Sequence, residues 1–129
     1  MINEEDRTAL VNYRIEQAIS TTELSKFLIE SDKLIVAVNR IYYGIFYSVT
    51  ALALKYQFET SKHSQLIGWF NKEFIATKRI DKKYGKILRN AYQNRTKGDY
   101  DAFVSFQKEE VSTMLDEMID FINMVKTLL

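Results

Sequence analysis

The sequence predicts an all-α fold, a bundle of four or five amphipathic helices that forms one domain over residues 1–129. The chain has no proline and only four glycines, so few positions would interrupt a long helix. Apolar residues make up 47% of the chain and recur at helical spacing through most of it. A chain of 129 residues can bury a core without disulfides or a metal, so we expect it to fold alone or as a small oligomer.

The first three helices follow from the positions of their apolar residues. The first is expected over about residues 3–30, and the Ser-Thr-Thr-Glu pattern at 20–23 leaves open whether it is one helix or two, because this pattern has the form of a capping box. The second, over 32–56, is apolar on most sides and is therefore expected to be the central helix. After a polar connection, the third helix is expected to begin at His63.

The last two helices are placed by a glycine and by a heptad-like pattern. The fourth is expected to begin near Asp81 and to end before Gly98, because glycine is typical of a left-handed C-terminal cap. Asp99 and Tyr100 would then follow the end of the helix. The fifth, over about 104–129, carries apolar residues in near-heptad order, which suits packing in a bundle.

The residue inventory excludes several classes of site. The chain has no cysteine, and His63 is its only histidine, so we expect neither a disulfide nor a histidine-rich metal site, and no cofactor. It also lacks a glycine-rich phosphate loop and an identifiable Ser/His/Asp set. Residues 1–6 do not resemble a signal peptide, and the most apolar stretch, 34–54, is interrupted by Asn39 and Arg40. We therefore expect a cytoplasmic protein without a membrane partner.

Charge is unevenly distributed although the net charge is only +1. Between Lys62 and Lys97 there are ten basic residues and two acidic ones, and from Gly98 onward acidic residues predominate. One interpretation is that a basic helix packs beside an acidic one and that both are solvated. The other is that the basic segment attracts an anionic partner, a nucleic acid or a nucleotide.

An arginine interrupts the apolar pattern of the second helix. The helical spacing puts Arg40, Tyr43, Gly44, Tyr47 and Ala51 on one face. Arg40 could pair with a carboxylate of a neighbouring helix while Gly44 permits close packing. Alternatively, this face could form a pocket or a protomer interface where arginine and tyrosines meet a phosphate or a base.

A second arginine ends the apolar stripe of the fourth helix. Arg95 follows Tyr84, Leu88 and Ala91 at spacings of four, three and four residues. A guanidinium stays charged, so in this inward position it needs a carboxylate, backbone carbonyls or an anionic ligand. Asp99 could close the helix end as a local ion pair, or Arg95 could hold a phosphate or stabilise charge during phosphodiester cleavage.

His63 is the only side chain that normally titrates near neutral pH, which makes it the one ready general base. Its place on an apolar stripe also suits a histidine that is simply hydrogen-bonded at a helix start. The Lys62-His63 pair could instead bind an anion at the amino terminus of the third helix.

Three segments resemble the HEPN family of small prokaryotic proteins. Residues 37–46, Ala-Val-Asn-Arg-Ile-Tyr-Tyr-Gly-Ile-Phe, resemble the hallmark segment of that family, with Gly44 where alanine is usual. The Ser-Lys-His-Ser at 61–64 resembles the start of the third HEPN helix, and the Asn-Arg-Thr-Lys-Gly-Asp-Tyr at 94–100 resembles its Arg-x-x-x-Asp-Tyr ending. The resemblance implies an antiparallel bundle that often forms homodimers and is commonly encoded beside a nucleotidyltransferase, in two-gene systems of toxin–antitoxin type.

Active members of that family are metal-independent ribonucleases. Their signature is an arginine followed four to six residues later by a histidine, and two such motifs meet across a dimer cleft. In this chain the corresponding positions after Arg95 are Asp99, Tyr100 and Asp101. The chain thus resembles the branch of the family that lacks the catalytic histidine.

The leading hypothesis is a non-catalytic or weakly catalytic module that binds RNA or a nucleotide. The residues expected to bind are Arg40, Tyr43, Tyr47, Lys62, His63, Arg95, Asp99 and Tyr100. Two alternatives remain: a ribonuclease toxin that uses Arg95 with His63 or Tyr100, and a purely structural interaction protein in which Arg95 and Asp99 only tie off a helix.

Overall fold

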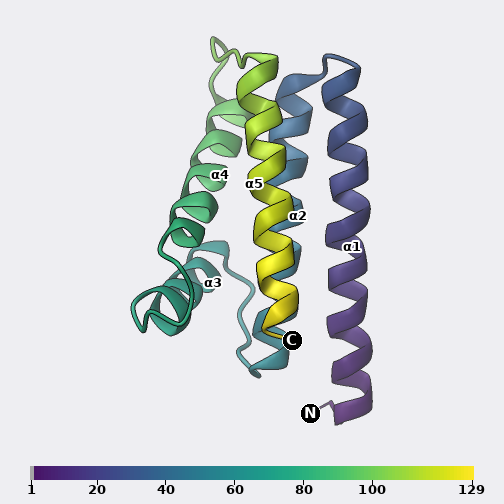
Figure 1. Ribbon diagram of the computed structural model, residues 1–129, viewed down its shortest axis with the longest axis vertical. Coiled ribbons are helices and arrows are strands. Elements are labelled where there is room, and N and C mark those ends of the chain that lie inside the picture. The colour runs from purple at the N-terminus through teal and green to yellow at the C-terminus, as the bar shows by residue number, and fades with distance from the viewer. Residues whose placement is uncertain (1) are drawn as a thin grey trace.

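A computed structural model describes residues 2–129, and within that range it contains five α-helices, one short π-helical segment and no strand (Figure 1). The elements are α1 (Glu4–Glu30), α2 (Leu34–Lys55), α3 (His63–Phe70), η1 (Asn71–Ile75), α4 (Lys83–Tyr100) and α5 (Lys108–Thr127). The four long helices run alternately up and down the long axis, and the short α3 lies at one end beside the start of α4. The predicted all-α, antiparallel bundle is confirmed.

Helix α1 is one continuous helix, which answers the question left open at residues 20–23. It begins with Asn3 as its N-cap, whose Oδ1 accepts a hydrogen bond from the backbone N–H of Asp6 at 2.8 Å. The hydroxyls of Thr21 and Thr22 donate to backbone carbonyls one turn earlier, at 2.7 and 3.0 Å. These threonines therefore satisfy their hydroxyls inside the helix and do not cap a new one.

Helix α2 is the central helix, as predicted. It packs against α1, α4, α5 and α3, and its fully buried residues include Tyr42, Leu52 and Ala51. Its length and composition would also allow it to cross a membrane, but half of that apolar window is buried inside the bundle. A Cβ at Gly44 would meet the end of the Met118 side chain and lie 3.3 Å from the Thr21 methyl, so this glycine permits the close approach of α1 and α5.

The predicted end of α4 before Gly98 is wrong. The helix continues to Tyr100, no glycine among residues 2–129 has a positive φ, and the backbone N–H of Asp101 donates to the carbonyl of Lys97 at 2.9 Å. A Cβ at Gly98 would lie 3.5 Å from the Ile35 side chain, so the last turn packs against the start of α2. This packing keeps the turn helical, and it leaves Asp99 on the same helix face as Arg95.

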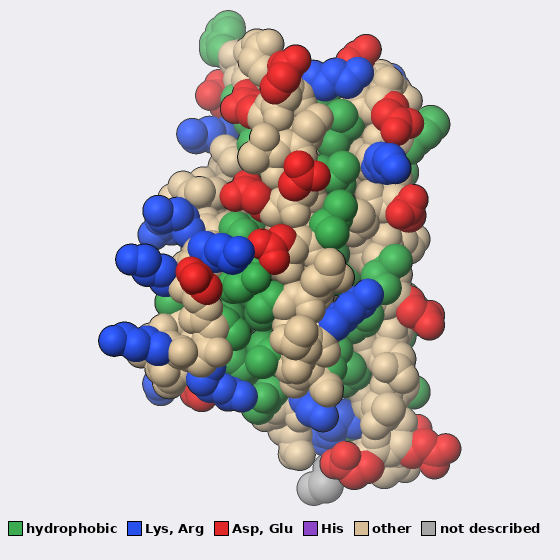
Figure 2. Space-filling view, viewed as in Figure 1, with side chains coloured by type: hydrophobic (Ala, Val, Ile, Leu, Met, Phe, Trp, Pro, Cys, Tyr) green, Lys and Arg blue, Asp and Glu red, His purple; other side chains and the backbone are tan. Residues whose placement is uncertain are grey.

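Helix α5 begins four residues later than the pattern suggested. Gln107 caps it, and the Glu110 side chain accepts a hydrogen bond from the Gln107 backbone N–H at 2.8 Å, which completes a capping box. Acidic side chains run down α5, and basic side chains gather at the edge formed by α4 and the segment before it (Figure 2). Each interpretation of the charge pattern therefore has some support. Lys83 pairs with Asp120 of α5 at 3.1 Å, as expected for a basic helix beside an acidic one. The other lysines of that edge are exposed and could meet an anionic partner.

Candidate functional site

Arg95 and Tyr43 form the centre of the candidate site. Arg95, near the end of α4, donates a hydrogen bond from Nη2 to the hydroxyl oxygen of Tyr43 at 2.7 Å. Its Nε lies 3.1 Å from Asp99 Oδ2, one helical turn further along α4. The side chains of Arg95 and Asp99 are 17% and 28% exposed, so water only partly screens this ion pair. The local ion pair considered from the sequence is therefore present.

The Arg95 guanidinium is held more by charge and aromatic faces than by hydrogen bonds. It lies 5.4 Å from the Tyr42 ring centroid and 5.3 Å from that of Tyr43, within cation–π range. Its Nε is buried and has no hydrogen-bond acceptor among residues 2–129, because the N–H is not directed at the Asp99 carboxylate. Burial alone would lower the pKa of Arg95, but the Tyr43 hydroxyl and the Asp99 charge raise it, so the group stays cationic.

Arg40 joins the same group of side chains through Asn39. The Arg40 guanidinium donates from Nε and Nη2 to Asn39 Oδ1 at 2.9 and 2.7 Å and lies 4.8 Å from the Tyr43 ring centroid. Asn39 Nδ2 in turn donates to both Asp99 oxygens at 3.2 Å. We call Asn39, Arg40, Tyr43, Arg95 and Asp99 the arginine–tyrosine cluster. Within residues 2–129 no carboxylate pairs directly with Arg40, and Asp99, which pairs with Arg95, reaches Arg40 only through Asn39.

His63 lies next to this cluster, on the other side of Tyr42. Its Nδ1 and the Tyr42 hydroxyl share a hydrogen bond of 2.7 Å, and its ring stacks on Phe46 with the centroids 4.0 Å apart. Burial lowers the pKa of His63 below 6.5, and the Arg95 charge lowers it further, so the ring is neutral at pH 7. Tyr42 is fully buried, and burial raises its pKa, which keeps the phenol protonated. His63 is thus a hydrogen-bonded histidine at a helix start, and the nearby charge of Arg95 contributes to its lowered pKa.

The remaining predicted residues lie at different distances from the cluster. Tyr47 is half-buried one turn after Tyr43, with ring centroids 6.1 Å apart. Lys62 is exposed at the start of α3, and no ion pair of its side chain is present among residues 2–129. Tyr100 is 78% exposed at the end of α4 and makes no side-chain hydrogen bond in the described part of the chain.

Sequence reasoning missed two residues that hold the site together. Asn39 bridges Arg40 and Asp99, and Tyr42 contacts both His63 and Arg95. The Tyr42 ring is fully buried, so helical periodicity identifies it only as a core position. The signal that could have found Asn39 was its position inside the family-like segment 37–46.

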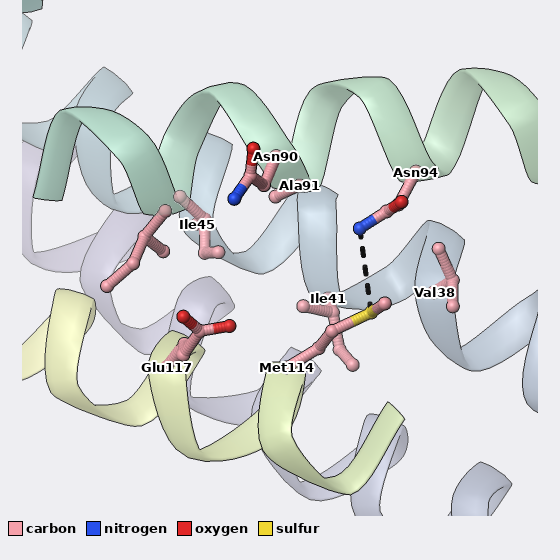
Figure 3. A pocket seen from close by; sticks show the side chains of 9 residues that line it. Val38, Ile41, Ile45, Asn90, Ala91, Asn94, Met114 and Glu117 are labelled. Carbon is pink, nitrogen blue, oxygen red and sulfur yellow. Dashed lines mark hydrogen bonds between the residues drawn. The ribbon is translucent and has the colours of Figure 1, made fainter. Parts of the chain in front are cut away.

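An enclosed cavity between α2, α4 and α5 is too small to be the ligand site. It has a volume of about 20 Å³, room for about one water molecule (Figure 3). The side chains of Asn90, Asn94 and Glu117 border it, and Asn94 Nδ2 lies 4.0 Å from Met114 Sδ. Burial raises the pKa of Glu117. Residues 2–129 contain no group of three or more acidic, histidine or cysteine side chains that could hold a metal.

Two of the open grooves that are large enough for a ligand have linings relevant to the cluster or to an anionic partner. The aromatic groove lies between α1, α2 and α3, has a volume of about 470 Å³, and is lined mainly by apolar and aromatic side chains, among them Leu10, Phe46, Tyr47, His63 and Leu66. The basic groove lies between α3, η1 and α4 and has a volume of about 650 Å³. Its basic lining residues are Lys82, Lys83, Lys86 and Arg89.

The chain belongs to the HEPN domain family. Residues 11–128 match that family, which covers the bundle from α1 to the end of α5 and includes both arginines of the cluster. The family resemblance carried by the segments at 37–46, 61–64 and 94–100 is thereby confirmed.

Similar proteins are known from Thermotoga maritima and Methanocaldococcus jannaschii. The chain is 33% identical over 128 residues to the UPF0332 protein of Thermotoga maritima, covering 99% of this chain and 96% of the relative. Two proteins of Methanocaldococcus jannaschii, named "Putative toxin MJ0142" and "Putative toxin MJ0605", are 38% and 32% identical over 112 residues. These alignments cover 87% of this chain and 76% and 83% of the relatives. The chain is therefore a HEPN module similar to proteins that carry toxin names.

Proposed function

We propose that this single HEPN module binds RNA or a nucleotide through the arginine–tyrosine cluster. The observation behind the proposal is the excess of positive charge in that cluster. Arg40 and Arg95 both lie within cation–π range of the Tyr43 ring, and among residues 2–129 the only carboxylate within 4.0 Å of either guanidinium is Asp99, which pairs with Arg95. A phosphate supplies the missing negative charge and accepts hydrogen bonds from guanidinium groups in a favourable geometry. The Tyr43 hydroxyl, which accepts from Arg95, keeps its own proton available for a phosphate oxygen.

The basic groove supports the same proposal at longer range. Lys82, Lys86 and Arg89 line it without a carboxylate partner within 4.0 Å among residues 2–129. Such exposed cations attract a polyanion without reading its sequence, and their contribution weakens as salt rises.

The test is a comparison of two single-charge losses on one helix. Labelled single-stranded RNA is titrated with wild type, Arg95→Ala and Arg89→Ala at low and moderate salt, with thermal melts to verify folding. We expect Arg95→Ala to lose more than about tenfold in affinity, the scale of one charge-assisted contact of about 1.5–3 kcal/mol. Arg89→Ala should lose only a few-fold. Equal losses would mean that net charge alone matters, and absent or salt-independent binding of wild type would refute the proposal.

A ribonuclease activity is the second candidate, and the position of His63 favours it. His63 is neutral at pH 7 and is hydrogen-bonded to Tyr42, whose ring is contacted by Arg95. A general base, His63, and a charge-stabilising group, Arg95, therefore lie close together. In the same assay, RNA cleavage that disappears in both Arg95→Ala and His63→Ala would establish the enzyme. Retention of RNA without cleavage would establish a binding module.

For partners we propose a homodimer and a nucleotidyltransferase encoded beside it, in the cytoplasm. The support is the family resemblance, together with the toxin names of the relatives, which are compatible with a toxin–antitoxin pair. Five large apolar residues of α1 are exposed and offer a surface for association: Leu10, Tyr13, Ile19, Leu24 and Phe27. Co-expression with the product of the neighbouring gene, followed by size-exclusion chromatography with light scattering, tests both partners.

A further inference from the structure

The aromatic groove has the size and lining of a site for a small organic group. Its volume of about 470 Å³ falls within the usual range of ligand pockets. Apolar side chains come from three helices, Leu10 from α1, Phe46 from α2 and Leu66 from α3, and polar side chains also line the groove, Arg14 and Glu59 among them. One of those polar groups is His63. Its Nε2 takes part in no hydrogen bond among residues 2–129, whereas its Nδ1 is engaged by Tyr42.

This groove and the arginine–tyrosine cluster share one wall. Tyr47 and His63 line the groove, and their ring centroids lie 6.1 and 6.0 Å from that of Tyr43. The Tyr43 ring is also contacted by the guanidinium groups of Arg40 and Arg95, at 4.8 and 5.3 Å from its centroid. A ligand that reached from the cluster into the groove would therefore meet cations at one end and flat aromatic rings at the other.

We propose that the aromatic groove binds a nucleobase whose attached phosphate is held by Arg40 and Arg95. This inference rests on the proposed function and adds to it a second contact, which selects nucleotides over other phosphates. A nucleobase is flat, stacks on aromatic side chains, and presents edge groups that the free Nε2 of His63 can hydrogen-bond. Inorganic phosphate or a sugar phosphate satisfies the cations only and leaves the apolar surface exposed to water.

The structure also provides a close pair of positions for testing the groove. Leu10 and Leu24 are the same residue type on the same helix, with exposed fractions of 40% and 44%. Leu10 lines the aromatic groove, and Leu24 does not. Leu10→Trp therefore fills the groove with a larger ring, and Leu24→Trp makes the same chemical change outside it. Tyr47→Leu is a second groove variant that removes an aromatic wall without adding bulk.

The experiment measures binding of AMP, ribose 5-phosphate and a short unpaired oligoadenylate to wild type and the three variants. For wild type we expect AMP to bind about tenfold or more tightly than ribose 5-phosphate, the gain typical of one stacked base. Leu10→Trp and Tyr47→Leu should remove this difference while leaving ribose 5-phosphate binding unchanged, and Leu24→Trp should keep it. A base effect that occurs only with the oligonucleotide would support the groove and identify unpaired RNA as the source of the base.

The experiment distinguishes failure of the groove inference from failure of the proposed function. If ribose 5-phosphate and AMP bind equally, both depend on Arg95, and oligoadenylate binding is unchanged by Leu10→Trp and Tyr47→Leu, the cluster binds phosphate and the groove inference is overturned alone. A base effect that persists in both groove variants also overturns it, because the base then binds elsewhere. If none of the three probes binds wild type, the proposed function fails together with the inference.

Discussion

Replacing Asp99 by asparagine removes the carboxylate that pairs with Arg95 and would compete with an anionic ligand for it. The change preserves size, and the amide oxygen can still accept the hydrogen bond that Asn39 Nδ2 donates at 3.2 Å. What is lost is the negative charge 3.1 Å from Arg95 Nε. The proposed function then predicts that Asp99→Asn increases the affinity for phosphate ligands, although most substitutions at a binding site would weaken it.

The magnitude follows from the distance and the partial burial of the pair. Two charges about 4 Å apart attract by about 1 kcal/mol in water and about 4 kcal/mol in the surroundings typical of a protein surface. Because Arg95 and Asp99 keep 17% and 28% of their side-chain surface in water, we take about 1–2 kcal/mol as the screened value. Release of Arg95 should thus strengthen phosphate binding about five- to thirtyfold at low salt. The loss of the ion pair should lower the free energy of unfolding by no more than about 1 kcal/mol.

The assay is isothermal titration with AMP and with RNA, beside thermal melts, for wild type, Asp99→Asn and Asp120→Asn. Asp120 is a matched control because it also pairs with a basic residue at 3.1 Å, Lys83, but lies outside the cluster. Equal gains in both variants would show that net charge, not the cluster, drives binding. A loss of affinity in a folded Asp99→Asn protein would refute the reasoning, because Asp99 would then position Arg95 for the ligand instead of competing with it.

Three further predictions concern the packing around the cluster. Because the folded pKa of His63 is lowered, unfolded chains take up its proton below about pH 6.5 and folded chains do so only at lower pH. The free energy of unfolding should therefore fall as pH decreases below 6.5, and His63→Gln should lose this part of the dependence in denaturant titrations between pH 5 and 8. Tyr42→Phe leaves the partly buried His63 Nδ1 without its partner, so it should lower the free energy of unfolding by about 1 kcal/mol, measured by the same titrations. An unchanged midpoint would argue against a structural role of this bond. Gly44→Ala gains about 1 kcal/mol of helix propensity but crowds Met118 and Thr21, so we expect the free energy of unfolding to fall by about 1 kcal/mol. This loss should be smaller in a protein that also carries Met118→Val, because the shorter side chain makes room for the new methyl group.

The helical bundle could be predicted because its causes are local. Few helix breakers and regular apolar spacing sufficed to place the helices and to identify α2 as the central one. Helix ends were predicted less well, since a glycine can cap a helix or continue it. At Gly98 the outcome depends on Ile35, which lies more than 60 residues earlier in the sequence and packs against the last turn.

The candidate site could be predicted only as a set of residues, not as an arrangement. Arg40 and Tyr43 were placed on one face from helical spacing, and the Arg95–Asp99 pair from its spacing of four. The contact between Arg95 and Tyr43 joins residues 52 positions apart, and the contact between Tyr42 and His63 spans 21 positions. Such contacts depend on how the helices pack, which periodicity does not specify. Asn39 was missed for the same reason, because its role is to reach Asp99 across the α2–α4 interface.

The length of α4 determines which side chain faces Arg95, and therefore whether that side chain can donate a proton. Since the helix continues through Tyr100, residue 99 lies one turn after Arg95 on the same face, while the exposed Tyr100 points away from it. The residue facing the arginine is therefore a carboxylate, which when ionised accepts hydrogen bonds but donates none. Asp99 can tune how strongly Arg95 attracts an anion, but it cannot replace the histidine of the ribonuclease motif as a proton donor. Of the two groups considered for proton transfer, His63 is hydrogen-bonded to Tyr42, whose ring contacts Arg95, whereas Tyr100 is exposed. The His63→Ala arm of the cleavage assay therefore tests catalysis separately from binding.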